Sequence, residues 1–160
     1  MSILVVGSVA FDTVQTPAGR AEGVLGGSAS YFSVAASFFA PVHLEAVVGK
    51  DFSEENARIF RDRDIALGGL SHLPGKTFRW SGVYGDDINQ RTTLATELNV
   101  FEKFEPVLPE RLRKSDYLFL ANIDPDLQRS VLNQVKRPKL VACDTMNFWI
   151  EGKRDSVLQM

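Results

Sequence analysis

The sequence has 160 residues, of which 44% are hydrophobic, with 18 basic and 20 acidic side chains and a formal net charge of -2. That length and hydrophobic content suit one folded domain, or a substantial part of a larger one, and exclude a disordered tail. Because neither sign of charge runs in blocks, we expect no nucleic-acid or anionic-membrane surface, which leaves small neutral partners open.

The single cysteine, Cys143, excludes an internal disulfide. It lies in the apolar run LVAC, which predicts a buried and inert thiol. The N-terminal apolar run has no basic flank and is broken by glycine and aspartate well short of a membrane-spanning length. These features predict a cytoplasmic protein and indicate no export or anchoring signal.

The first part of the chain alternates strands and helices. A short apolar run at 3–6 predicts a central strand, and 42–48 and about 65–70 predict two more. Ser28 is the expected cap of a helix over 29–39, and Ser53 that of a helix over about 54–63. The inward residues expected on these helices are Ala29, Phe32, Ala36 and Phe39, then Ala57, Ile59 and Phe60.

Residues 77–84 and 92–100 alternate strictly between apolar and polar side chains, and the turn-rich segment GDDINQR joins them. This pattern predicts an antiparallel hairpin. Each arm then has one face that needs cover. The residues on these faces are Phe78, Trp80 and Tyr84 in the first arm and Leu94, Leu98 and Val100 in the second.

The α/β pattern returns after the hairpin. We expect a buried strand at 117–120, a helix from Asp124-Pro125 to about Val135, and a strand at 139–143. The sequence therefore predicts a parallel sheet with helices on both faces, interrupted midway by the hairpin. Functional loops in such a fold lie at the carboxyl ends of the strands. Polar residues follow three expected strands: Asp12, Asn122, and Asp144 with Asn147.

The segment LGGSASYFSVAASFF places two glycines, Gly26 and Gly27, directly before a helix. One interpretation is that the glycines let a ligand approach the backbone, so that free N–H groups of the first helical turn donate to a hydroxylated or anionic ligand. The other is a tight turn that needs a positive φ. This segment alone does not decide between the two.

Asp12 and Asn122 also have two interpretations each. A carboxylate accepts a fork of hydrogen bonds from vicinal sugar hydroxyls, and an amide both donates and accepts, but both residue types are common in turns. The two histidines, His43 and His72, have no partner at metal-ligand spacing, so we assign no metal site. No G-x-S-x-G nucleophile motif occurs.

Several stretches together resemble, in order and spacing, the N-terminal half of the ribokinase family of carbohydrate kinases, also called the phosphofructokinase B family. They are VVGSVAFD, LGGSASYFSVAA, AVVGKDF, the alternating hairpin, FLANIDP and CDTMN. The resemblance covers nearly the whole chain, and the combination is far more specific than any one piece.

The resemblance implies that 1–160 form the N-terminal portion of a three-layer αβα kinase domain with a mainly parallel sheet. A small β lid would come from about 13–25 and 77–100. It also implies transfer of the γ-phosphoryl group of ATP, with Mg²⁺, to a hydroxymethyl group of a sugar or nucleoside. The implied substrate-binding residues are Asp12, Gly26, Gly27, Tyr31, Phe78, Trp80 and Asn122. Asn147 would lie towards the phosphate and magnesium region.

The sequence departs from the family pattern at several positions. Tyr31 replaces the usual asparagine five residues after the first glycine, and its ring suits stacking on a base or a flat sugar face. The usual glycine soon after Asp51 is absent, and CDTMN spaces Asp144 and Asn147 one residue wider than D-x-N.

The family's G-A-G-D motif, whose aspartate deprotonates the substrate hydroxyl, does not occur before Met160. We therefore expect the general base and the nucleotide-binding half to lie beyond Met160, and the chain alone to be inactive as a fragment or one half of a split molecule.

An alternative function is a non-catalytic ligand-binding or dimerisation module with a kinase-like fold, in which the apolar hairpin clasps a second copy. A Rossmann-type cofactor binder is disfavoured because GSVAFD lacks G-x-G-x-x-G.

Overall fold

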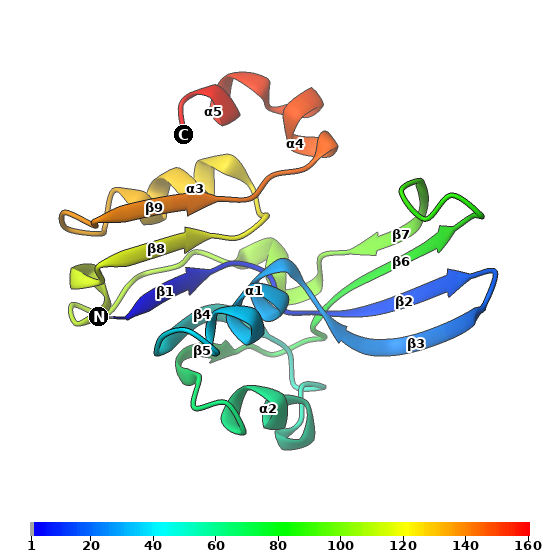
Figure 1. The fold of residues 1–160 in the computed structure, drawn as a ribbon, viewed down its shortest axis with the longest axis horizontal. Helices are drawn as coiled ribbons and strands as arrows, with labels where there is room; N and C mark the ends of the chain where they lie inside the picture. Colours follow the sequence, from blue (N-terminus) through cyan, green and yellow to red (C-terminus); the bar gives the residue numbers. More distant parts are fainter. Residues whose placement is uncertain (1) are drawn as a thin grey trace.

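A computed structural model describes residues 2–160, which form two sheets and the helices packed on them (Figure 1). The larger sheet has five strands in the order β5-β4-β1-β8-β9, and all its pairs are parallel. Its strands are β1 (Ile3–Val6), β4 (Val42–Val48), β5 (Ala66–His72), β8 (Tyr117–Leu120) and β9 (Leu140–Cys143). The predicted α/β fold with a mainly parallel sheet is thus confirmed.

Helices cover both faces of this sheet, because its central strands are apolar on both faces. On one face lie α1 (Ser28–Ala36) and α2 (Glu54–Arg61), whose Phe60 shares one core cluster with Val5 and Leu44 of the sheet. On the other lie α3 (Pro125–Leu132) and two 3-10 turns. The turns are η1 (Asn99–Lys103) and η2 (Leu112–Lys114).

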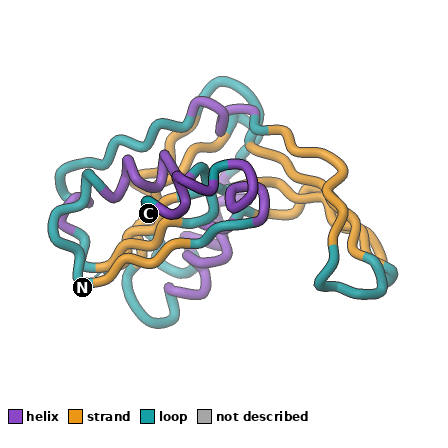
Figure 2. Tube along the Cα trace, turned by 90° about the horizontal axis from the view of Figure 1, so that it is seen from above, coloured by secondary structure: helices purple, strands orange, loops and turns teal. Residues whose placement is uncertain are grey.

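The smaller sheet has four strands in the order β3-β2-β6-β7. They are β2 (Ala10–Thr16), β3 (Gly19–Gly26), β6 (Phe78–Tyr84) and β7 (Arg91–Glu97). The predicted hairpin is antiparallel as expected, with Trp80 opposite Thr96, but its second arm ends at Glu97 and Val100 packs in η1. Figures 1 and 2 show this sheet projecting from the larger sheet, and in Figure 1 it lies on the side towards which β1, β8 and β9 point.

The predicted helices form, but each ends earlier than expected. Helix α1 stops at Ala36, α2 at Arg61 and α3 at Leu132. The side chain of Ser53 does cap α2, and that of Asp124 caps α3. The prediction for Ser28 is wrong, because Gly27 is the N-cap of α1 and Ser28 lies in its first turn. The end of a helix depends on tertiary contacts that the repeat of apolar residues does not encode.

Two burial predictions are wrong on α1 and α2. Phe39 lies beyond the end of α1 and is 86% exposed, and Ile59 of α2 is 38% exposed. The apolar faces of these helices are instead completed by small or aromatic side chains. Those that pack as expected are Ala29, Phe32, Ala36, Ala57 and Phe60.

Cys143 is exposed, which corrects the expectation of a buried thiol. It ends β9, which pairs only with β8 and is therefore an edge strand of the larger sheet. The apolar run LVAC predicted the strand correctly, but not its place in the sheet. Helices α4 (Asn147–Gly152) and α5 (Arg154–Leu158) follow β9. Among residues 2–160, no helix has the length and apolar character needed to cross a membrane.

Candidate functional site

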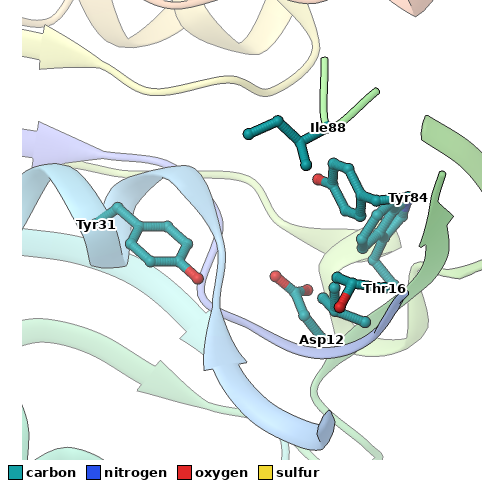
Figure 3. A pocket seen from close by; sticks show the side chains of 7 residues that line it. Asp12, Thr16, Tyr31, Tyr84 and Ile88 are labelled. Atoms are coloured by element: carbon teal, nitrogen blue, oxygen red, sulfur yellow. The ribbon is translucent and has the colours of Figure 1, made fainter. Parts of the chain in front are cut away.

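A cavity of about 510 Å³ lies where the smaller sheet meets the start of α1 (Figure 3). Its wall is built mainly from alternate residues of β2 and β6, because successive side chains of a strand point to opposite faces. The lining residues are Asp12, Val14, Thr16, Tyr31, Trp80, Tyr84 and Ile88. The cavity therefore combines one carboxylate with three aromatic rings.

Asp12 is the acidic group of this cavity and is held against the glycine pair. A Cβ atom on Gly26 would overlap the Asp12 carboxylate, so only glycine leaves the carboxylate in this position. Burial raises the pKa of Asp12 to about 6, and the backbone N–H of Gly27 opposes that rise. The structure thus brings Asp12, Gly26 and Gly27 together, as the sequence motif predicts.

Gly27 has a φ of 91°, a left-handed conformation that favours glycine, and a Cβ there would meet the carbonyl oxygen of Ser8. The loop that contains Ser8 therefore lies directly against the start of α1. The Ser8 hydroxyl accepts a hydrogen bond from Ser28 N at 3.2 Å, and the Ser8 carbonyl oxygen accepts one from Ala29 N at 3.1 Å.

These contacts correct one sequence-based interpretation. The first-turn N–H groups of α1 were candidates to bind a ligand, but Ser8 takes those of Ser28 and Ala29. The carbonyl of Gly27 takes those of Ser30 and Tyr31. Only the Gly27 N–H remains directed at the Asp12 carboxylate. The N–H groups from Ser28 to Tyr31 are thus already bonded within the protein.

Tyr31 projects from α1 towards Asp12 across the cavity, as Figure 3 shows. Burial raises the pKa of the Tyr31 hydroxyl, and the negative charge of Asp12 raises it further. The hydroxyl therefore stays protonated at neutral pH and can donate a hydrogen bond.

Trp80 forms the opposite wall with Tyr84. Its indole lies over Gly82, where a Cβ would collide with the ring, and its Nε1–H donates to Thr93 Oγ1 of β7 at 3.3 Å. Register in the parallel pair of β2 and β6 sets Trp80 beside Asp12. The ring is thus fixed in orientation by two neighbouring strands.

Four predicted substrate-binding residues do not line this cavity: Gly26 and Gly27, which lie against Asp12, and Phe78 and Asn122, which lie further away. Phe78 stacks on Phe101 of η1, with ring centroids 5.5 Å apart, at the base of the smaller sheet. Asn122 follows β8, and its main-chain carbonyl oxygen accepts a hydrogen bond from the Ser28 hydroxyl at 3.4 Å. Its side-chain Oδ1 is buried and has no hydrogen-bond partner.

Asn147 lies apart from the first cavity, at the start of α4. It lines a second, polar cavity of about 380 Å³ together with residues of the turn between β6 and β7 and of β7 itself. The other residues of this cavity are Asn89, Gln90, Arg91 and Thr93. Among residues 2–160, no three acidic, histidine or cysteine side chains gather as a metal site would require.

Sequence reasoning gave no binding role to four residues of the first cavity, although it placed Tyr84 on the same face as Trp80; they are Val14, Thr16, Tyr84 and Ile88. Val14 and Thr16 lie on the same face of β2 as Asp12, and Tyr84 lies on the same face of β6 as Trp80. The alternation of side chains along a strand could therefore have indicated these three residues. Ile88 lies in the turn after β6, and no local pattern marks a turn residue as part of a cavity wall.

Comparisons with known proteins agree with this fold. The cytidine kinase of Thermococcus kodakarensis is 28% identical over 138 residues, which cover 85% of this chain and 49% of that protein. The nucleoside kinase of Methanocaldococcus jannaschii, described as an archaeal member of the ribokinase family, matches 99% of this chain and 56% of its own, with a TM-score of 0.71 at 17% identity.

A fructokinase with bound ATP from Xylella fastidiosa matches 90% of this chain and 51% of its own, with a TM-score of 0.66 at 14% identity. No protein-family model matches the sequence. The resemblance to the ribokinase family is nonetheless confirmed, because the chain has the fold of these kinases and one of them is related in sequence. The chain spans about half the length of the relatives it matches.

Proposed function

We propose that this chain is the acceptor-binding part of a kinase that transfers the γ-phosphoryl group of ATP to a hydroxymethyl group of a sugar or nucleoside. The observation that carries the proposal is the Asp12 carboxylate, held by Gly26 and Gly27 in a cavity walled by aromatic rings. A carboxylate among rings suits a ligand that has both hydroxyl groups and a flat face.

Asp12 orients the acceptor in this proposal. Its ionised form accepts two hydrogen bonds in a fork, which matches vicinal hydroxyls of a ribose or hexose. Since the pKa of Asp12 is about 6, the carboxylate is largely ionised at neutral pH. We assign it no role as the catalytic base and assign no other catalytic residue within the described chain.

The rings of Tyr31, Trp80 and Tyr84 supply the apolar cover. Stacking against a base or a sugar face adds contact area, and the Tyr31 hydroxyl adds a donor opposite Asp12. The smaller sheet then acts as a lid that keeps water from the transferred group. The cytidine kinase relative favours a nucleoside as the acceptor.

ATP supplies the phosphoryl group, and the fructokinase neighbour contains it. We propose that Asn147 and Arg91 face its phosphates, because the second cavity is lined by amide, guanidinium and hydroxyl donors that suit phosphate oxygens. The described residues offer no cluster of acidic ligands for Mg²⁺, so we assign no residue to that ion.

The test is an acceptor-binding and ATP-consumption assay on the natural protein at its full length, with a panel of nucleosides and sugars. We expect Asp12→Ala to weaken acceptor binding by more than about tenfold, because it removes a fork of charge-assisted hydrogen bonds. Asp116→Asn is a matched control, since Asp116 pairs with Lys139 away from the cavity.

Two outcomes separate the proposal from its alternative. Acceptor binding without ATP consumption by the full-length protein would favour the non-catalytic ligand-binding module. If Asp12→Ala binds every acceptor as tightly as the wild type, the site assignment is wrong.

A further inference from the structure

A junction connects the two sheets beside the cavity, and Asp51 is its centre. Asp51 follows β4 of the larger sheet, yet its carboxylate accepts hydrogen bonds only from the start of β6 in the smaller sheet. The donors are Thr77 N and Thr77 Oγ1 at 2.7 Å each and Arg79 Nη2 at 2.8 Å. Although burial raises the pKa of Asp51, these bonds hold it below its usual value.

Thr77 is fully buried, and its N–H, hydroxyl and carbonyl groups all form hydrogen bonds. Its hydroxyl accepts from Gly49 N at 3.0 Å, and its carbonyl oxygen accepts from the side chain of Asn99 at 3.0 Å. A Cβ on Gly49 would overlap the backbone of Gly75 to Thr77. The loop after β4 and the start of β6 are therefore packed backbone to backbone.

Arg79 also contacts β2, the strand that carries Asp12. Its guanidinium lies over the ring of Phe11 at 5.3 Å from the centroid, and Phe11 is itself buried and stacked on Phe52. Phe11 pairs with Arg79, and the next pair in register is Asp12 with Trp80. Because side chains alternate, the pair held by Asp51 lies on one face and the cavity pair on the other.

We propose that Asp51 and Arg79 are positioning residues, which fix the register and tilt of β6 so that Trp80 stands at the correct distance from Asp12. Neither residue lines the cavity, so they act through their neighbours. The inference rests on the proposed function for the site that they position.

The energetic argument favours positioning over stability. Both side chains of the ion pair are partly exposed, at 39% and 27%, and ion pairs of that kind add little to global stability. Small displacements of a binding group, by contrast, change rates and affinities strongly. Loss of the junction should thus be seen first at the cavity.

The experiment uses Asp51→Asn and Arg79→Met in the full-length natural protein, with Trp149 and any tryptophan outside this chain replaced by phenylalanine. Acrylamide quenching of Trp80 reports the position of the ring without any ligand. Cytidine is the binding probe, with affinity measured by calorimetry. We expect Trp80 to become more accessible and the cytidine Kd to rise about tenfold or more, with the melting temperature lowered by only a few degrees.

Two further variants keep the result interpretable. Arg20→Met removes a more exposed ion pair, Arg20 with Glu22, from the same sheet and should change neither readout. Arg79→Lys keeps the positive charge but lacks the planar fork, so we expect it to restore part of the affinity lost in Arg79→Met. It also replaces Arg79→Met if that protein does not fold.

The failures of the two proposals are distinguishable. If Trp80 quenching in Asp51→Asn and Arg79→Lys equals that in Arg20→Met, the junction does not position the ring and the inference is overturned. If the wild type binds neither cytidine nor any sugar, the proposed function fails, while the Trp80 quenching still decides whether the junction positions the ring.

Discussion

At the scale of one residue, the partly buried carboxylate of Asp12 is the group on which the proposed site depends. Asp12 has a pKa of about 6 because burial among the mainly aromatic and apolar walls of the first cavity disfavours its charge. Groups shifted in this way cluster at functional sites. The identity of residue 26 is part of the same arrangement, because Gly26 leaves the space that the carboxylate occupies.

Gly26→Ala should therefore act on the cavity more than on the fold. Gly26 has no left-handed φ, so alanine is not strained there, but its Cβ displaces the Asp12 carboxylate. We expect acceptor affinity to fall by about tenfold, since the carboxylate leaves its binding position. Gly85→Ala, where a Cβ meets open space, is the control. Equal acceptor affinity in both variants, measured by calorimetry, would contradict this role of Gly26.

The site was predictable at this scale only where a motif marked it. The sequence indicated Asp12, Gly26 and Gly27 correctly as neighbours, because the glycine pair and the residue after the first strand form a recognisable pattern. It did not indicate that Ser8 takes the N–H groups of α1, since that contact joins a loop to a helix 20 residues away.

At the scale of the element, two helices that each have a serine at their start differ in how that start is capped. Ser53 and Asn56 form a reciprocal capping box on α2, with Ser53 N donating to Asn56 Oδ1 at 2.9 Å and Asn56 N to Ser53 Oγ at 3.3 Å. Ser28 makes no such bond, because Ser8 already occupies the start of α1. A serine before a helix predicts a cap, but a neighbouring loop can replace it.

Ser53→Ala should lower the free energy of unfolding by about 1 kcal/mol, the usual effect of removing a serine N-cap. The measurement is urea denaturation followed by circular dichroism. Ser130→Ala in α3 is the matched control, because Ser130 is exposed and its side chain caps nothing. If the two variants have the same urea midpoint, the capping box of α2 contributes no stability.

At the scale of the whole molecule, Glu45 lies where β4, β5 and the segment that carries Arg111 come together. It lies on β4 and is only 6% exposed, its carboxylate packs against Gly69 of β5, and its Oε2 has no hydrogen-bond partner. Burial raises the pKa of Glu45 to about 7, and the positive charge of Arg111 opposes the rise. The fold therefore holds a carboxyl group that prefers to be neutral.

This group makes stability depend on pH with a definite sign. Because the pKa is raised from 4.5 in the folded state, the folded protein holds the proton more tightly than the unfolded chain. The contribution of Glu45 to stability thus decreases as the pH rises from about 4.5 to 7. Glu45→Gln mimics the neutral form and should match the wild type near pH 5 and exceed it in stability near pH 8.

Urea midpoints at several pH values check this expectation. Glu105→Gln, an exposed site, is the control and should show no growing difference. A constant offset between Glu45→Gln and the wild type from pH 5 to pH 8 would mean that Glu45 titrates normally.

The sequence by itself determined the alternation of strands and helices and the antiparallel hairpin, because these follow from local periods of two and 3.6 residues. Only the tertiary structure decided that β9 is an edge strand with Cys143 exposed, that α1 ends at Ala36, and that Ile88 lines the cavity. Those features depend on contacts between segments far apart in the chain. Local patterns carry no information about such contacts, which form only in the folded molecule.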